Sequence, residues 1–153
     1  MTQPVDIPCS FDFPGLTLEG QDPFPKYETA GAAAVDLHAR ECVWVRPGEV
    51  KPVRTGLKLA MPEGVAALIL PRSGLGVRGM VLGNLVGLVD SDYRGELTVA
   101  IWNRNTKGNP FHIEEGMRFA QLMFVPYVRA NLIKVEKLEP TSRGEGGFGS
   151  TGK

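Results

Sequence analysis

Glycine and proline interrupt this chain so often that long helices have no room to form. The 153 residues include 19 glycines and 12 prolines, and the longest stretch without either is 32–46. Proline lacks a backbone donor and glycine weakens helix interiors, so this spacing favours short strands joined by tight turns. We expect an all-β fold, a jelly-roll-like sandwich or barrel, with at most one short helical turn near 73–77.

Several segments between these breaks have the apolar patterns of strands. Residues 65–70 form an apolar run that suits a buried strand, and Leu97, Val99 and Ile101 alternate along 96–104. The other expected strands are 43–46, 50–60, 117–128 and 132–138. Composition changes only after Pro140, which predicts a domain at 1–140 and an appended, flexible, glycine-rich arm at 141–153.

Charge and cysteine content narrow the possible partners. Lys+Arg and Asp+Glu number 17 each, so the broad basic surface of a nucleic-acid binder is missing and we predict no nucleic-acid partner. No apolar run approaches membrane length and no signal peptide is visible, which predicts no membrane association. Cys9 and Cys42 form no CxxC pair, which favours a reducing, cytoplasmic setting. The two histidines are too few and too separated to indicate a zinc site.

The last eleven residues, 143–153, combine five glycines with Arg143 and Phe148. Glycines can turn several N–H groups toward one anion, and an arginine fork fits phosphate oxygens. An aromatic ring among them can stack on a base. The same composition suits a disordered tail, so both interpretations stay open at this point.

Two internal clusters carry groups suited to chemistry on a phosphate. Arg72, Ser73 and Gly74 follow the apolar run and can hold oxyanions, although an ordinary strand-to-loop exit has the same composition. Asn84 offers an amide that can read a base edge. Asp90 ends the next apolar run, where partial desolvation would suit a carboxylate that deprotonates water. The alternative is a β-hairpin whose acids only cap the turn.

Two more polar side chains lie in apolar settings. Gln121 either faces a pocket or is a half-exposed strand residue. Asp36 must find a hydrogen-bond partner. Taken together and in order, the segments 34–39, 71–75, 87–95, 116–121 and 143–149 resemble the five motifs of the trimeric dUTPase family, bacterial type. The resemblance runs from about Tyr27 to the C-terminus.

The resemblance implies a jelly roll that assembles as a homotrimer, with three active sites at subunit interfaces. The implied activity is a dUTP diphosphatase, which hydrolyses dUTP to dUMP and pyrophosphate by water attack on the α-phosphorus. In the family this reaction keeps uracil out of DNA and supplies dUMP for dTMP synthesis. Mg²⁺ is the implied cofactor, held mainly by substrate phosphates and waters.

The resemblance also implies residue roles. Asp90 matches the acid that activates the water, and Tyr93 matches the ring that packs on deoxyribose and obstructs a 2′-hydroxyl. Uracil is read by Asn84 and by the backbone of Leu88, Val89 and Thr98. The phosphate contacts, supplied by a neighbouring subunit or subunits, are Arg72, Ser73, Gly74 and Gln121.

The C-terminal motif and Asp36 complete the implied site. Arg143 matches an arginine that reaches the terminal phosphate, and Phe148 matches a ring that stacks on uracil, which makes 141–153 a lid over the site. Asp36 matches an acid tied to site architecture, with any contact to the metal indirect.

One loop departs from the family pattern, and two alternatives share the fold. The loop 76–80 is one residue shorter than expected and lacks a basic-plus-histidine pair. A dCTP deaminase would need a glutamate and a second serine near Arg72 and Ser73, where this chain has Gly74. A non-catalytic nucleotide-binding regulator is the other alternative, and the presence of Asp90, Tyr93 and Phe148 argues against it.

Overall fold

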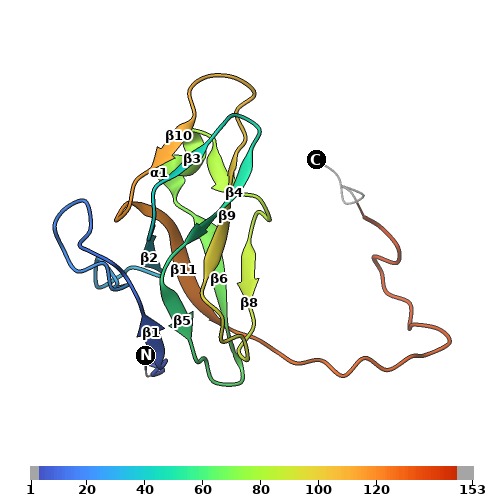
Figure 1. The fold of residues 1–153 in the computed structure, drawn as a ribbon. Coiled ribbons are helices and arrows are strands. Elements are labelled where there is room, and N and C mark those ends of the chain that lie inside the picture. Colours follow the sequence, from blue (N-terminus) through green and yellow to red (C-terminus); the bar gives the residue numbers. More distant parts are fainter. Residues whose placement is uncertain (1–3, 148–153) are drawn as a thin grey trace.

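The computed structural model describes residues 4–147 of the chain, and almost all of its regular structure is β (Figure 1). In chain order the elements are β1 (Cys9–Phe11), β2 (Val35–His38), β3 (Val43–Val45), β4 (Val50–Arg54), β5 (Leu57–Leu59), β6 (Val65–Pro71), α1 (Ser73–Val77), β7 (Met80–Leu82), β8 (Gly87–Val89), β9 (Thr98–Asn103), β10 (Phe111–Ile113) and β11 (Arg118–Pro126). The expected all-β, jelly-roll-like fold with one short helix is confirmed, and the helix lies at the predicted position.

The strands form antiparallel sheets whose neighbours are mostly distant in sequence. The largest sheet has the order β2-β11-β6-β8, and a second has the order β4-β9-β7. Two smaller sheets pair β1 with β5 and β10 with β3. The long strand β11 joins β2 to β6 and runs through the centre of the molecule (Figure 1). Such crossovers bring the predicted motifs together at a few places in the fold.

The core lies between these sheets and uses the alternation expected of half-buried strands. Along β9, Val99 and Ile101 are buried, as predicted, while Thr98 is exposed. The buried Asn103 donates from Nδ2 to the Val45 carbonyl at 3.0 Å, so its amide is satisfied. In the described part of the chain, no helix is long and apolar enough to cross a membrane.

Two strand predictions are wrong. The expected strand 50–60 is broken into β4 and β5 at Thr55 and Gly56, because Gly56 turns the chain with φ +75°. The expected strand 132–138 is absent, because the chain leaves the body after β11 and finds no neighbouring strand to pair with (Figure 1). Its apolar side chains are exposed as a result: Leu132 by 91% and Leu138 by 81%.

Candidate active site

A cavity of about 220 Å³ lies along β8 and the start of β9. Its walls are mostly apolar, with a few polar groups, which is typical of sites for small molecules. The lining residues are Ile69, Leu82, Asn84, Gly87, Leu88, Val89, Asp90, Tyr93, Glu96, Leu97, Thr98, Val99 and Ala100. The six predicted contacts for base, sugar and water activation, namely Asn84, Leu88, Val89, Asp90, Tyr93 and Thr98, are therefore brought together in one cavity.

The turn between β7 and β8 forms one wall of this cavity. Leu85 has φ 62° and is the only residue other than glycine with a positive φ among residues 4–147. Its N–H donates to the Leu82 carbonyl at 3.1 Å, and the Val86 N–H donates to the Asn84 carbonyl at 2.7 Å. Strained backbone of this kind gathers at binding sites, where the surrounding structure holds it.

Gly87 allows β8 to approach β6 closely behind the Asn84 amide. A Cβ at Gly87 would lie 3.0 Å from the Cβ of Ile69 and 3.6 Å from Nδ2 of Asn84. Because real Cβ contacts are rarely this short, a side chain here would push the hairpin apart. The missing side chain therefore keeps this end of the cavity narrow, as a site for a flat ring requires.

Asp90 follows β8 directly and lies where two hollows meet. It lines both the 220 Å³ cavity and a neighbouring hollow of about 800 Å³. Asp90 is exposed in the isolated chain, because no other part of residues 4–147 covers it. The expected partial desolvation of its carboxylate is therefore wrong for one chain by itself. Water therefore reaches this carboxylate, as a base acting on water requires.

Tyr93 is fixed against the turn that follows Asp90. Its Oη donates to the carbonyl of Glu96 at 3.2 Å, and a Cβ at Gly95 would come within 2.3 Å of Oη. Glu96 also lines the cavity but was missed by sequence reasoning. Its position at the start of a predicted strand offered no signal, because its role depends on residues about forty positions away.

A second cluster gathers the predicted phosphate ligands around Arg72. Its Nε lies 3.0 Å from Oδ1 of Asp36, and its Nη1 donates to the Arg118 carbonyl at 3.1 Å. Gln121 donates from Nε2 to the Pro71 carbonyl at 2.9 Å. Asp36, whose side chain is only 13% exposed, has thus found the partner that its apolar setting required. Ser73 and Gly74 are exposed beside this cluster, at the start of α1.

Arg118 extends this cluster to the N-terminal loop, a connection that sequence reasoning missed. Its Nη1 lies 3.5 Å from Oδ2 of Asp36, and its Nη2 lies 3.2 Å from Oε1 of Glu19. A hydrogen bond from the backbone of Glu19, reinforced by the charge of Arg118, lowers the pKa of the Glu19 carboxyl. The four charged side chains thus alternate in sign, and each arginine is held by at least one acid.

His38 lies beside this network and is buried, with 6% of its surface exposed. Its Nδ1 has no hydrogen-bond partner in the described part of the chain. Burial lowers the pKa of the imidazole, and this effect outweighs the Pro23 carbonyl and the Asp36 charge, which act in the opposite direction. The ring is therefore neutral at neutral pH.

A family model described as dUTPase matches residues 21–152, which is most of the chain. The chain belongs to the dUTPase family. A protein of Actinobacillus succinogenes named deoxyuridine 5′-triphosphate nucleotidohydrolase is 54% identical, over 89% of this chain and 91% of the relative. A protein of Haemophilus influenzae with the same name is 53% identical, over 86% of this chain and 88% of the relative. Both relatives are bacterial, as the resemblance implied.

Solved dUTPase structures share the fold. A mutant dUTPase of Staphylococcus bacteriophage 80alpha with dUpNHpp has a TM-score of 0.80 and 26% identity, covering 97% of this chain and 99% of the phage chain. A dUTPase mutant of phage phi11 of S. aureus, described with a structural Mg(II) ion, has a TM-score of 0.75 and 22% identity. It covers 88% of this chain and 99% of its own, and that likeness concerns the fold alone.

Within one chain, the predicted site residues fall into separate groups. The 220 Å³ cavity and the Arg72 cluster share no residue. Arg143 belongs to neither group. It is exposed on the arm that extends away from the body, and its Nε donates to the Gly146 carbonyl at 2.9 Å (Figure 1). Phe148 lies outside the described residues.

Proposed function

We propose that Asp90 is the base in a site that binds uracil, deoxyribose and a triphosphate in that order. The chain is a dUTP diphosphatase, an enzyme that hydrolyses dUTP to dUMP and pyrophosphate. The observation that supports the site best is the convergence of six predicted contacts on one 220 Å³ cavity. The relatives at 53–54% identity carry the nucleotidohydrolase name, and nothing favours the deaminase or regulator alternatives.

The cavity suits a nucleoside whose base enters at the Asn84 end. The Asn84 amide offers both a donor and an acceptor to the edge of uracil, alongside the backbone of Leu88, Val89 and Thr98. The close approach of β8 to Ile69 at Gly87 supports a narrow base site, which we expect to exclude a thymine methyl. The Tyr93 ring, fixed on Gly95, would pack on deoxyribose and clash with a 2′-hydroxyl.

In the proposed reaction, Asp90 accepts a proton from a water as the water oxygen bonds to the α-phosphorus. The bond from that phosphorus to the bridging oxygen breaks, and pyrophosphate leaves in line. Arg72 and Arg143 offset the charge on the phosphates, with Ser73, Gly74 and Gln121 completing the contacts. Asp90 thus acts as a positioned base, while the arginines act as fixed cationic donors to the phosphates.

The separation of the two groups supports a site shared between subunits. Because the Arg72 cluster and the cavity do not meet within one chain, a neighbouring copy would bring its arginine to the nucleotide. Exposed apolar side chains on the segment 127–140, which leads to the arm, also lack cover within one chain, such as Ile133 at 75% and Leu138 at 81%. Both features support a homotrimer with active sites at its interfaces.

Mg²⁺ fits this site as an ion carried by the substrate phosphates. No cluster of three or more His, Cys, Asp or Glu side chains able to hold a metal occurs among residues 4–147. Both oxygens of Asp36 face arginines, so Asp36 would reach a metal only through water. Mg²⁺ keeps several waters and favours phosphate oxygens, and when bound it would neutralise part of the triphosphate charge.

The arm 141–153 is the proposed lid over the nucleotide, separate from the β domain at 1–140. Residues 141–145 and Gly147 are exposed, and no strand or helix occurs from 127 to 147. A segment with so few contacts can close over a ligand without disturbing the fold. We also propose a cytoplasmic setting, since Cys9 and Cys42 are both free thiols.

A pyrophosphate-release assay with dUTP, dCTP and dTTP in the presence of Mg²⁺ tests the activity. We expect turnover of dUTP only, and its absence would refute the function.

Asp90→Asn should keep the fold and nucleotide binding but lose several orders of magnitude in kcat, because the base is gone. Normal turnover by that variant would refute the role of Asp90. Light scattering tests the trimer, and a fully active monomer would rule out a shared site.

A further inference from the structure

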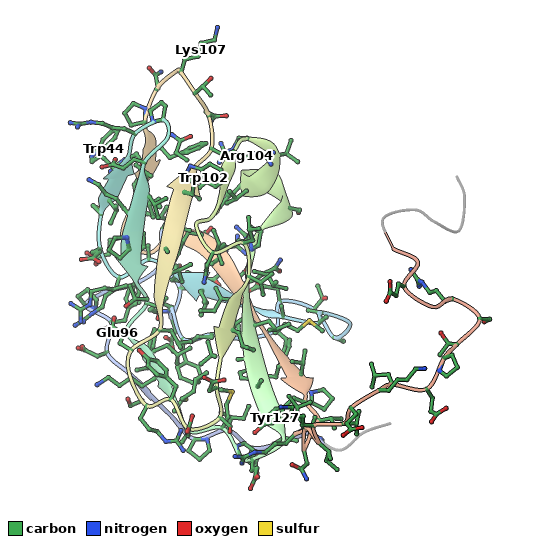
Figure 2. All side chains as sticks on the ribbon, turned by 90° about the vertical axis from the view of Figure 1, so that its right-hand side faces the viewer. Trp44, Glu96, Trp102, Arg104, Lys107 and Tyr127 are labelled. Carbon is green, nitrogen blue, oxygen red and sulfur yellow. The ribbon has the colours of Figure 1, made fainter. Side chains whose placement is uncertain are left out.

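Glu96 is held by an unusually complete set of hydrogen bonds from one short segment. Its Oε2 accepts from Arg54, at 3.0 Å from Nε and 2.6 Å from Nη2, and its Oε1 accepts from the Gly56 N–H at 2.8 Å. The Glu96 side chain is 16% exposed. Figure 2 labels Glu96 near the end of β9 that lies farther from Trp102. Because Arg54 holds one carboxylate oxygen and Gly56 holds the other, the plane of the carboxylate is fixed as well as its position.

The same segment also holds the residue that follows Glu96. The buried hydroxyl of Thr55 donates to the Leu97 carbonyl at 2.7 Å, and the Leu97 N–H donates to the Leu57 carbonyl at 2.8 Å. Residues 54–57 thus form hydrogen bonds with residues 96 and 97 through both side-chain and backbone groups. Movement of Glu96 relative to β4 and β5 would break several bonds at once.

The break between β4 and β5 makes these hydrogen bonds possible. The β4–β9 pairing ends at Arg54 and Thr98, and beyond it the Gly56 N–H donates to a carboxylate in place of a strand carbonyl. The Glu96 carbonyl is therefore available for another donor, and that donor is the Tyr93 hydroxyl at 3.2 Å. A regular strand through residues 50–60 would not provide this arrangement.

We propose that Arg54, Gly56 and Glu96 form a clamp that positions Tyr93 and thereby sets the discrimination between deoxyribose and ribose nucleotides. The inference rests on the proposed function, in which the Tyr93 ring packs on the sugar. Tyr93 is 47% exposed, so packing alone does not fix its ring. The clamp fixes the Glu96 carbonyl, and that carbonyl fixes the phenol at the cavity wall. Glu96 is a positioning residue, since it acts through Tyr93.

The test is the ratio of kcat/KM for dUTP to kcat/KM for UTP. Glu96→Gln keeps the size of the side chain but loses the charge that holds Arg54, and we expect the ratio to fall by about tenfold or more, the scale of one lost charged hydrogen bond. Tyr93→Phe removes only the bond to the Glu96 carbonyl and should lower the ratio in the same direction. If Glu96→Gln does not fold, Tyr93→Phe decides the test.

Asp12→Asn is the matched control. It breaks the neighbouring Arg40–Asp12 pair, at 2.5 Å, on the other side of the same corner and does not touch Glu96. This control should keep the wild-type ratio. A wild-type ratio in Glu96→Gln, with dUTP turnover present, would overturn the clamp and leave the proposed function intact. A wild-type protein without dUTP turnover would instead refute the proposed function itself.

Discussion

Gly56 is the position where one added methyl group should do the most damage to this fold. Its φ is +75°, and a Cβ there would lie 2.1 Å from the carbonyl oxygen of Asp12 and 2.9 Å from the carbonyl carbon. Both are backbone atoms, so no side-chain rotation relieves the overlap. Gly56→Ala must therefore push the Asp12 backbone and the corner between β4 and β5 apart, so both are displaced.

The cost of Gly56→Ala has three parts. A left-handed φ costs an alanine about 1–2 kcal/mol. Moving the Asp12 backbone breaks the bond from the Asp12 N–H to the Gly56 carbonyl at 2.9 Å, worth about 1 kcal/mol. Moving the corner weakens the bond from the Gly56 N–H to Glu96, a charged acceptor worth roughly 2 kcal/mol. The sum is about 4–5 kcal/mol, or a fall in Tm of roughly 8–20 °C for a chain of this length.

Thermal unfolding of Gly56→Ala beside Gly48→Ala separates the strain from the clash. Gly48 has a nearly identical φ of +77°, but nothing lies within 4 Å of its Cβ position. Gly48→Ala should therefore cost only the backbone term, about 1–2 kcal/mol. Equal losses of Tm in the two variants would refute the argument from close approach. Gly56→Ala should also lower the dUTP-over-UTP ratio, since it displaces the clamp.

Two further predictions concern the arm and the pH response. Cutting the chain after Pro140 should leave Tm nearly unchanged, because residues 141–145 and Gly147 are exposed and lie outside the core. The dUTP turnover should fall strongly if the arm supplies ligands as proposed, and undiminished turnover would refute the lid. The pKa of His38 is lower in the folded chain than its ordinary 6.5, so the unfolded chain binds the proton more readily and stability should fall as pH drops below about 6.5. Urea unfolding at pH 7 and pH 5.5 gives the change in the free energy of unfolding between the two pH values. This change should be smaller in His38→Gln than in the wild type, and an equal change would assign the pH response to another group.

The local pattern of the chain was enough to predict most of the strands and the helix. β6, β9, β11 and α1 lie where apolar runs and turn residues placed them. The prediction of one strand over 50–60 was wrong, because the side-chain pattern continues through Gly56 and gives no sign of a break. The close approach of Asp12, which requires a glycine there, is a tertiary contact. The strand 132–138 failed because a strand pattern needs a neighbour to pair with, and one chain offers none there.

The sequence alone determined the fold class, the order of the five motifs and the types of group proposed to contact the nucleotide, because these depend on local residue chemistry and spacing. Only the tertiary structure decided which of those groups meet. Asn84, Asp90 and Tyr93 are close in sequence, but strand pairing closes their cavity with the distant Ile69 and Thr98. It also places Arg72 in a separate cluster with Asp36 and Arg118, which no local pattern encodes. The fold also gave Glu96 its partners, because a carboxylate about forty residues from Arg54 has no identifiable role until β4 and β9 lie side by side.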